Sequence, residues 1–182
     1  KDSKDLIATL PKDTVYKELI QESIRQLNLV SENVEHIRKA MNELASTLPE
    51  YDTVMNMYGV GPTFGPQLIA EIGDISRFQH REALTAYAGV DPGKNDSGQE
   101  VHTSSHASKC GSSRLRHTLF QIMSAMLQNG AKEDDAVSRF LFKKKAENKP
   151  YLVYMTAGAN KFLRVYYGKV KECLHGQEHT KQ

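Results

Sequence analysis

One stretch decides the organisation of this chain: residues 59–117, which read GVGPTFGPQLIAEIGDISRFQHREALTAYAGVDPGKNDSGQEVHTSSHASKCGSSRLRH. It begins with a glycine turn in which Gly59 and Gly61 can adopt backbone conformations closed to other residues, and Pro62 suits the first position of a helix. Two short helices joined by Gly-Val-Gly predict a helix-hairpin-helix motif, whose exposed amides can bind a DNA phosphate. A purely structural helical hairpin is the alternative.

A polar loop follows the helical run that ends at Gly89. Almost all of residues 90–100 are turn formers, and they include Ser97-Gly98. Such a run inside a compact domain is typical of a functional or mobile segment. Serines in loops usually form turns. The residue types alone therefore do not decide whether Ser97 is a turn residue or a nucleophile. Ser104 and Ser105 are rival serines in the same region.

A basic helix is predicted to begin after this loop, with Ser112 as its N-cap. Arg114 and Arg116 fall in its first turns, where the macrodipole disfavours cations unless an anion is near. Together with Lys109, just before the helix, they are candidate ligands of a phosphate. Ordinary surface charge is the alternative for each.

Further helices are predicted outside this region, and no strand pattern is present. Residues 13–48 have apolar positions at a mean spacing of 3.5 residues, which is typical of a coiled coil. An amphipathic helix folded back on its own domain is the alternative. Short helices are predicted over 53–58 and 82–88, and longer ones over 134–147 and 151–174. The predicted fold class is therefore all-α, a long coiled-coil-like helix followed by a helical domain.

Composition and charge narrow the function classes. The 182 residues are 39% hydrophobic and 25% charged, which fits a soluble globular protein, and no apolar run of about 18 residues predicts a membrane span. Residues 102–182 carry 14 Lys and Arg against 6 Asp and Glu, although the net charge is only +2. A basic half is typical of a polyanion binder, and a solvated lysine-rich helix face is the alternative. Two cysteines suit a reducing cytosol.

The sequence gives only weak indications of a metal-binding site. Three possible zinc ligands recur every four residues: His102, His106 and Cys110. Their segment has no helical character, and no fourth ligand is evident. Three loop acids would suit Mg²⁺ but are more typical of a solvated loop: Asp91, Asp96 and Glu100. No metal site is predicted in this chain.

The order and spacing of these motifs resemble the C-terminal transposase domain of the insertion-sequence-110 type transposases and the related Piv/MooV DNA invertases. That domain has the pattern GVGP…AxxLxAEIGDxxRFxxxxxLxAYAGLxPxxxxSG…SKxGNxxLRxxL. The matching residues are Gly59-Val60-Gly61-Pro62, Leu68, Ala70-Glu71-Ile72-Gly73-Asp74, Arg77-Phe78, Leu84, Ala86-Tyr87-Ala88-Gly89, Pro92, Ser97-Gly98, Ser108-Lys109, Gly111 and Leu115-Arg116. The resemblance covers about residues 52–128, and more loosely the basic helix near Lys161.

The resemblance implies a two-part recombinase. In the family the serine of the Ser-Gly motif attacks DNA and forms a covalent serine–DNA intermediate, which gives that role to Ser97. Mg²⁺ is held by an N-terminal RuvC-like domain, which we expect to be missing here, and no cofactor is expected in this fragment. The implied partners are DNA, a bridge-type non-coding RNA and further copies of the chain, as a dimer or tetramer through the 13–48 helix. The implied location is the bacterial cytoplasm, in association with the nucleoid.

These interpretations divide the chain into a helical linker or coiled-coil arm (1–50), a catalytic-serine domain (51–175) and a polar tail (176–182). Because the chain starts without Met or a signal-peptide pattern, we expect a fragment of a longer protein that is inactive alone. The sequence departs from the family pattern at Ser112, where the family has Asn, at Ser113, and at 64–66. Two rival functions stay open: a non-catalytic helix-hairpin-helix module for nucleic acid, and a coiled-coil assembly domain.

Overall fold

The computed structural model describes residues 14–91 and 107–180. Within these ranges the chain forms seven α-helices and one short 3-10 helix, and no β-strand. The prediction of an all-α fold is confirmed. The chain divides into two compact units, Lys1–Met41 and Asn42–Gln182. No helix in the described ranges combines the length and the apolar character needed to cross a bilayer.

The first unit is built on α2 (Thr14–Ala45), the long helix that the 3.5-residue spacing predicted. Ion pairs across one helical turn join Glu22 to Arg25 and Glu35 to Arg38, each at 2.7 Å. Apolar side chains of this unit are exposed, for example Leu27 at 65%. The coiled-coil partner that such a stripe calls for stays a prediction.

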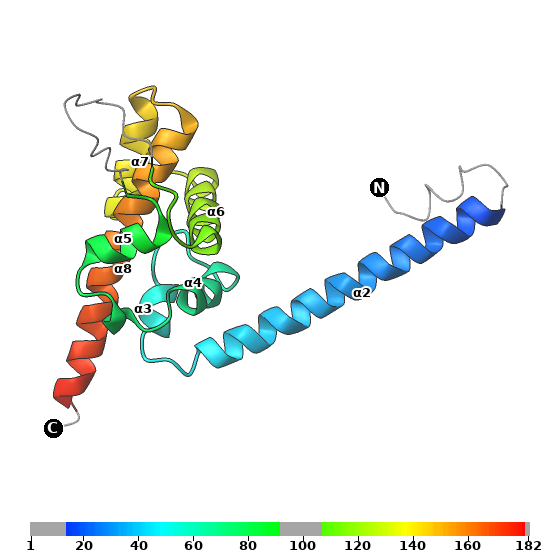
Figure 1. Cartoon of the computed structure of the whole chain (residues 1–182), viewed down its shortest axis with the longest axis horizontal. Coiled ribbons are helices and arrows are strands. Elements are labelled where there is room, and N and C mark those ends of the chain that lie inside the picture. The colour runs from blue at the N-terminus through cyan, green and yellow to red at the C-terminus, as the bar shows by residue number, and fades with distance from the viewer. Residues whose placement is uncertain (1–13, 92–106, 181–182) are drawn as a thin grey trace. The chain divides into compact units, whose positions relative to one another are not determined.

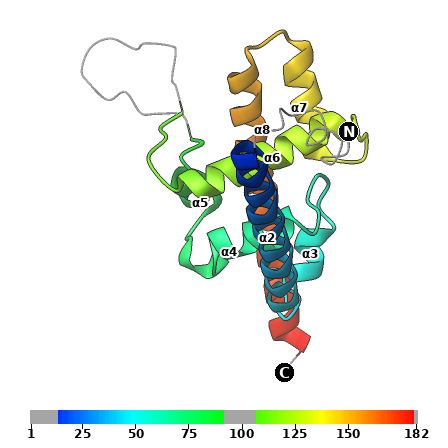
Figure 2. The ribbon, with the colours of Figure 1, turned by 90° about the vertical axis from the view of Figure 1, so that its right-hand side faces the viewer.

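The second unit contains the remaining helices, which are α3 (Tyr51–Met55), α4 (Phe64–Ile72), η1 (Ile75–Arg77), α5 (Arg81–Ala88), α6 (Ser113–Asn129), α7 (Ala136–Ala146) and α8 (Tyr151–Thr180). Helix α8 packs against α3, α5, α6 and α7 (Figure 1), and α6 runs across it (Figure 2). Large side chains with almost no exposure fill the space between α4, α5, α6, α7 and α8: Leu68, Ile72, Leu84, Leu115, Leu119, Ile122, Met123, Met126, Leu141, Met155, Phe162 and Tyr166.

The glycine turn joins α3 to α4 as two short helices in contact. Pro66 is compatible with α4 because it is the third residue of the helix, within the first turn, where backbone amides have no intrahelical partner. The helix begins at Phe64, two residues after Pro62, which the sequence suggested as its first position. The DNA-binding helix-hairpin-helix motif itself stays a prediction.

Caps explain where the other short elements begin. The Asp74 side chain accepts a hydrogen bond from the Ser76 amide and starts η1, and the Ser112 side chain accepts one from the Leu115 amide at 3.1 Å and starts α6. The Ser112 cap was predicted. Helix α5 begins at an unpredicted cap, the His80 ring nitrogen Nδ1, which accepts from the Ala83 amide.

The C-terminal helix is longer than its sequence pattern indicates. We predicted an end at Leu174, and α8 continues to Thr180. The prediction was wrong because the polar composition after Leu174 does not terminate a helix by itself, and the segment holds one glycine, Gly176, and no proline. The aromatic side chains of α8 are mainly core: Tyr154, Phe162 and Tyr166 are buried, while Tyr151 is exposed.

Candidate functional site

The two ends of the segment that carries the Ser-Gly motif are hydrogen-bonded to each other. The amide of Ser108 donates to the Asp91 carbonyl at 3.0 Å, and the amide of Lys109 donates to the Gly89 carbonyl at 3.2 Å. The Ser108 hydroxyl also donates to the Asp91 carboxylate. Ser97 lies between these ends in the sequence and outside the described residues. Its predicted role is therefore untested, as are those of Ser104 and Ser105.

Two glycines allow the loop ends to approach helix α5. Gly89 ends α5 in the left-handed conformation, with φ of 65°. Gly111 has φ of 148°, and a Cβ there would overlap the Tyr87 carbonyl oxygen. The next residue, Ser112, donates its amide to that same carbonyl at 2.7 Å. The entry to α6 is thus fixed against the end of α5, and only a residue without a Cβ fits at Gly111.

Arg116, a predicted phosphate ligand, has an intramolecular partner. Its guanidinium donates to the Ala88 carbonyl at 3.0 Å, at the C-terminus of α5, where a positive charge is favourable. The side chain is half-buried. A Cβ on Gly89 would lie 2.6 Å from the same guanidinium. The contact gives Arg116 a structural role, and a DNA contact stays a prediction.

Lys109 and Arg114 are differently placed. Both are exposed, and within the described ranges neither forms an ion pair. The Lys109 backbone is left-handed, with φ of 51°, which is unusual for a residue with a side chain. Arg114 faces a small hollow between α4 and α6 that Gln67 and Glu71 also line. Among the described residues, no acidic side chain competes with an anion for an ion pair with these two cations.

The glycines of the first turn have different surroundings. Gly59 has φ of 79°, and a Cβ there would come within 2.5 Å of the Met126 side chain on α6. Its lack of a side chain therefore serves packing. Gly61 faces open space, with no atom within 4 Å of a Cβ. Of the two predicted DNA contacts, Gly61 is the one with room for a ligand.

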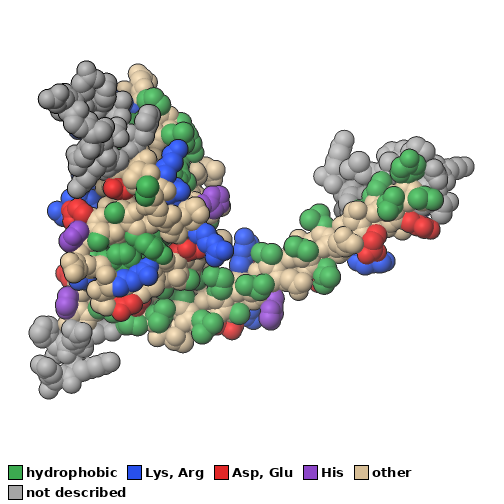
Figure 3. Space-filling model, viewed as in Figure 1, with side chains coloured by type: hydrophobic (Ala, Val, Ile, Leu, Met, Phe, Trp, Pro, Cys, Tyr) green, Lys and Arg blue, Asp and Glu red, His purple; other side chains and the backbone are tan. Residues whose placement is uncertain are grey.

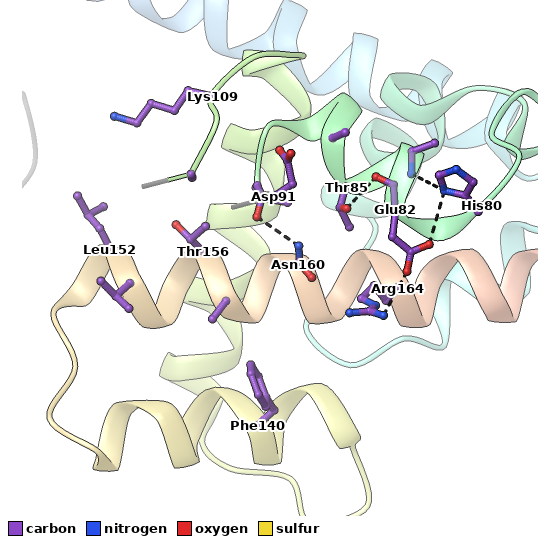
Figure 4. Close-up of a pocket in the computed structure, with 16 residues that line it drawn as sticks. His80, Glu82, Thr85, Asp91, Lys109, Phe140, Leu152, Thr156, Asn160 and Arg164 are labelled. Atoms are coloured by element: carbon purple, nitrogen blue, oxygen red, sulfur yellow. Dashed lines mark hydrogen bonds and ion pairs between the residues drawn. The ribbon is translucent and has the colours of Figure 1, made fainter. Parts of the chain in front are cut away.

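A groove of about 1040 Å³ lies beside the loop ends. Its walls come from α5, α7, α8 and the two loop ends, and Figure 4 shows Leu152, Thr156 and Asn160 on the side of α8 that faces Lys109 and Asp91. Asn160 donates to the Val90 carbonyl at 3.3 Å, which ties α8 to the start of the loop. At one end of the groove, ion pairs join the Glu82 carboxylate to Arg81 and Arg164. The hydrogen bond from Arg81 is the main cause that lowers the pKa of Glu82, so this acid is ionised at neutral pH.

The sequence comparisons bear on this second unit. Residues 51–137 match the model of the Transposase IS116/IS110/IS902 family. Over these residues the chain is similar to the transposase domain of that family. The resemblance inferred from the motifs is confirmed, and the loop ends, Gly59, Gly61, Lys109, Arg114 and Arg116 all lie inside the matched range.

Curated relatives agree with this assignment. The chain is 25% identical over 126 residues to the insertion element IS116 uncharacterized 44.8 kDa protein of Streptomyces clavuligerus, an alignment that covers 69% of this chain and 31% of that protein. It is 29% identical over 114 residues to the pilin gene-inverting proteins of Moraxella bovis and Moraxella lacunata. Each of these alignments covers 63% of this chain and 34% of the relative. The chain thus matches about a third of the length of these relatives.

Within the matched residues 51–137, the departure from the family pattern at Ser112 has a physical explanation. Asparagine and serine are both strongly preferred at helix N-caps, and Ser112 caps α6. Serine at this position therefore suits the cap of α6 as well as an asparagine would. The departure at 64–66 is also accommodated, because Gly65 and Pro66 are buried in the first turn of α4.

Metal binding by the second unit has no support in the described part of the chain. No group of three His, Cys, Asp or Glu side chains there is arranged to hold a metal ion. Each set weighed from the sequence includes residues outside the described ranges. Asp91, which is described, accepts a hydrogen bond from Ser108, and Cys110 is exposed.

Two features of the structure were not predicted from the sequence. They are the stacking of the Arg77 guanidinium on two aromatic rings and the hydrogen bond from Asn160 of α8 to Val90. The Arg77 guanidinium lies 4.7 Å from the Phe78 ring centre and 4.6 Å from that of Tyr87. The sequence motif contains Arg77 and Phe78 side by side. The stacking of Arg77 on Tyr87 could not be predicted, because it depends on how η1 packs against α5. Asn160 was hidden for the same reason, since its partner Val90 is 70 residues away.

Proposed function

We propose that this chain is the part of a DNA transposase or DNA-inverting recombinase that binds DNA and supplies Ser97 as the nucleophile. The supporting observation is the hydrogen-bonded base of the Ser-Gly loop, inside a transposase-family domain, with exposed cations beside it. A pilin gene-inverting protein among the relatives agrees with a role in DNA inversion or transposition.

The proposed chemistry is phosphoryl transfer. The Ser97 hydroxyl oxygen forms a bond to phosphorus while the bond from phosphorus to one deoxyribose oxygen breaks. The serine proton passes to a base, and the departing oxygen takes up a proton from an acid. A serine hydroxyl needs such activation because it is a poor nucleophile at its ordinary pKa.

Lys109 and Arg114 supply positive charge to the DNA in this proposal. Charge that is already in place opposite a phosphate stabilises the developing negative charge of the transition state. Both side chains are exposed, and within the described residues neither has an ion-pair partner to displace. The basic half of the chain, residues 102–182, adds attraction that does not depend on DNA sequence.

The proposal extends to the partners of the full-length protein. We infer an assembly of two or four copies through α2, whose apolar stripe is exposed. A bridge-type RNA would select the DNA, and Mg²⁺ would be held by a separate RuvC-like domain. These inferences rest on the family resemblance. We expect the 182-residue chain alone to bind DNA without cutting it.

Replacing the nucleophile tests the proposal. In the full-length recombinase, Ser97→Ala should abolish strand exchange and leave DNA affinity within about twofold, because a small loop side chain contributes little to phosphate binding. Ser104→Ala and Ser105→Ala are matched controls that should retain activity. If Ser97→Ala exchanges strands at the wild-type rate, the chain is a non-catalytic DNA-binding module.

A further inference from the structure

Arg77 is an exposed cation to which the proposed function gives no role. Its guanidinium lies 4.7 Å from the centre of the Phe78 ring and 4.6 Å from the centre of the Tyr87 ring. The two rings are tilted by 55° to each other, with their centres 5.4 Å apart. We propose that Arg77 binds a phosphate of the DNA backbone, in addition to Lys109 and Arg114. This inference rests on the proposed DNA-binding function of the chain.

The hydrogen-bond donors of the Arg77 guanidinium are not used within residues 14–91 and 107–180. A guanidinium presents its N–H groups in a planar fork that matches the oxygens of a phosphate. Among the described residues Arg77 forms no ion pair. The nearest acid in the sequence, Asp74, has both carboxylate oxygens hydrogen-bonded to Ser76, at 2.8 and 2.6 Å. The charge and the donors of Arg77 are therefore available to an anion.

The two aromatic rings restrict the guanidinium before any ligand arrives. Phe78 is buried, and Tyr87 is half-buried, with its hydroxyl donating to the Glu71 carbonyl at 3.5 Å. Stacking on aromatic faces uses the flat surface of a guanidinium and leaves its N–H edges for hydrogen bonds. A side chain that is already restricted loses less entropy when it binds, which strengthens binding. On the face of this unit seen in Figure 3, Lys and Arg side chains adjoin hydrophobic ones.

Contacts of Tyr87 connect Arg77 to the start of α6. The Tyr87 carbonyl accepts from the amide of Ser112, the N-cap of α6, at 2.7 Å. Arg114, in the first turn of α6, lines the small hollow that Glu71 also lines, and Glu71 is the residue whose carbonyl accepts from the Tyr87 hydroxyl. The same tyrosine therefore contacts Arg77 and the surroundings of Arg114. We accordingly place both arginines on one DNA backbone.

The test measures binding of a short fluorescent DNA duplex to the 182-residue chain over a series of salt concentrations. Arg77→Gln should weaken binding about 3- to 10-fold and lower the slope of log affinity against log salt concentration by about 1, because one phosphate contact is lost. Arg77→Lys should keep the slope and lose part of the affinity, because the ammonium keeps the charge without the planar fork.

Two further variants separate a phosphate contact from other roles. Arg81→Gln is the matched control, because Arg81 is also exposed but forms an ion pair with Glu82 at 2.9 Å. It should leave the slope nearly unchanged. Tyr87→Leu removes one ring and keeps the charge of Arg77, so it should weaken binding about two- to fivefold with the slope unchanged. The urea midpoint of each variant reports whether it is folded.

Three results would overturn the inference and leave the proposed function standing. The first is an affinity and a salt slope in Arg77→Gln equal to those of the wild type. The second is a lowered urea midpoint in Arg77→Gln without loss of affinity, which would make Arg77 a structural cation only. The third is an equal loss in Arg77→Gln and Arg81→Gln, because that pattern reflects the total charge of the chain. A wild-type chain that binds no duplex would contradict the proposed DNA binding itself, and the Arg77 contact with it.

Discussion

Gly111 shows how far one residue determines the geometry of this domain. Its φ of 148° and the nearby Tyr87 carbonyl leave no place for a Cβ. The Gly111→Ala variant should lose at least about 1–2 kcal/mol of unfolding free energy, the cost of an unfavourable backbone conformation for a residue with a side chain. Gly61→Ala is the matched control, because Gly61 faces open space, and it should change stability by less than about 0.5 kcal/mol. Urea denaturation measures the unfolding free energy of both variants. Equal unfolding free energies for Gly111→Ala and Gly61→Ala would contradict the role given to Gly111.

Tyr166 gives a prediction about pH. Burial raises the pKa of its hydroxyl, and the nearby Glu50 charge acts in the same direction. Because the folded-state pKa lies above the unfolded value of about 10, the contribution to stability is complete below that pH and is lost as pH rises further. Stability should fall less steeply above pH 10 in Tyr166→Phe than in the wild type. Tyr151→Phe serves as the control, because Tyr151 is exposed. If the unfolding free energy depended on pH identically in all three proteins, the raised pKa of Tyr166 would be contradicted.

Single residues also show where sequence reasoning stops. The cap role of Ser112 is local and could be predicted, because the residue type and the following three positions contain the information. The partner of Arg116 could not be predicted, since Ala88 is 28 residues away and the contact exists only after α5 and α6 meet. From the sequence Arg116 looked like a phosphate ligand, and its intramolecular bond gives it a structural role in addition.

At the scale of elements, the start of α6 is the most informative boundary. Ser112 replaces the family's asparagine and caps the helix through the Leu115 amide. Ser112→Ala should lower the unfolding free energy by about 1 kcal/mol, and Ser112→Asn should leave it nearly unchanged, because both Ser and Asn are strong N-caps. Thermal or urea unfolding measures the difference. If Asn were as damaging as Ala, the capping explanation for the departure would be wrong.

Helix existence was easier to predict than helix length. The 3.5-residue spacing identified α2, and the Ser112 cap identified the start of α6. The end of α8 was missed because composition after Leu174 is polar, whereas a helix ends where backbone geometry or capping stops it. The groove beside the loop was also out of reach, because α5, α7, α8 and both loop ends meet there only in the folded unit.

At the scale of the whole molecule, the charge distribution predicts how DNA binding depends on salt. Each phosphate contact by Lys or Arg contributes about 1 to the slope of log affinity against log salt concentration. Lys109→Gln and Arg114→Gln should each reduce that slope by about 1 and weaken binding to all sequences alike. Lys39→Gln, an exposed residue of α2, is the control and should leave the slope unchanged. Slopes equal to the wild type in the first two variants would remove these residues from the DNA contact.

In the proposed reaction Ser97 becomes covalently attached to DNA. The most direct measurement traps the full-length recombinase with its element-end DNA and any cognate RNA in denaturant, and then identifies the DNA-linked peptide by mass spectrometry. We expect an adduct on the peptide that spans residues 91–100, located on Ser97 and absent in Ser97→Ala. DNA cleaved without any protein adduct, or an adduct on Ser104 or Ser105, would contradict it.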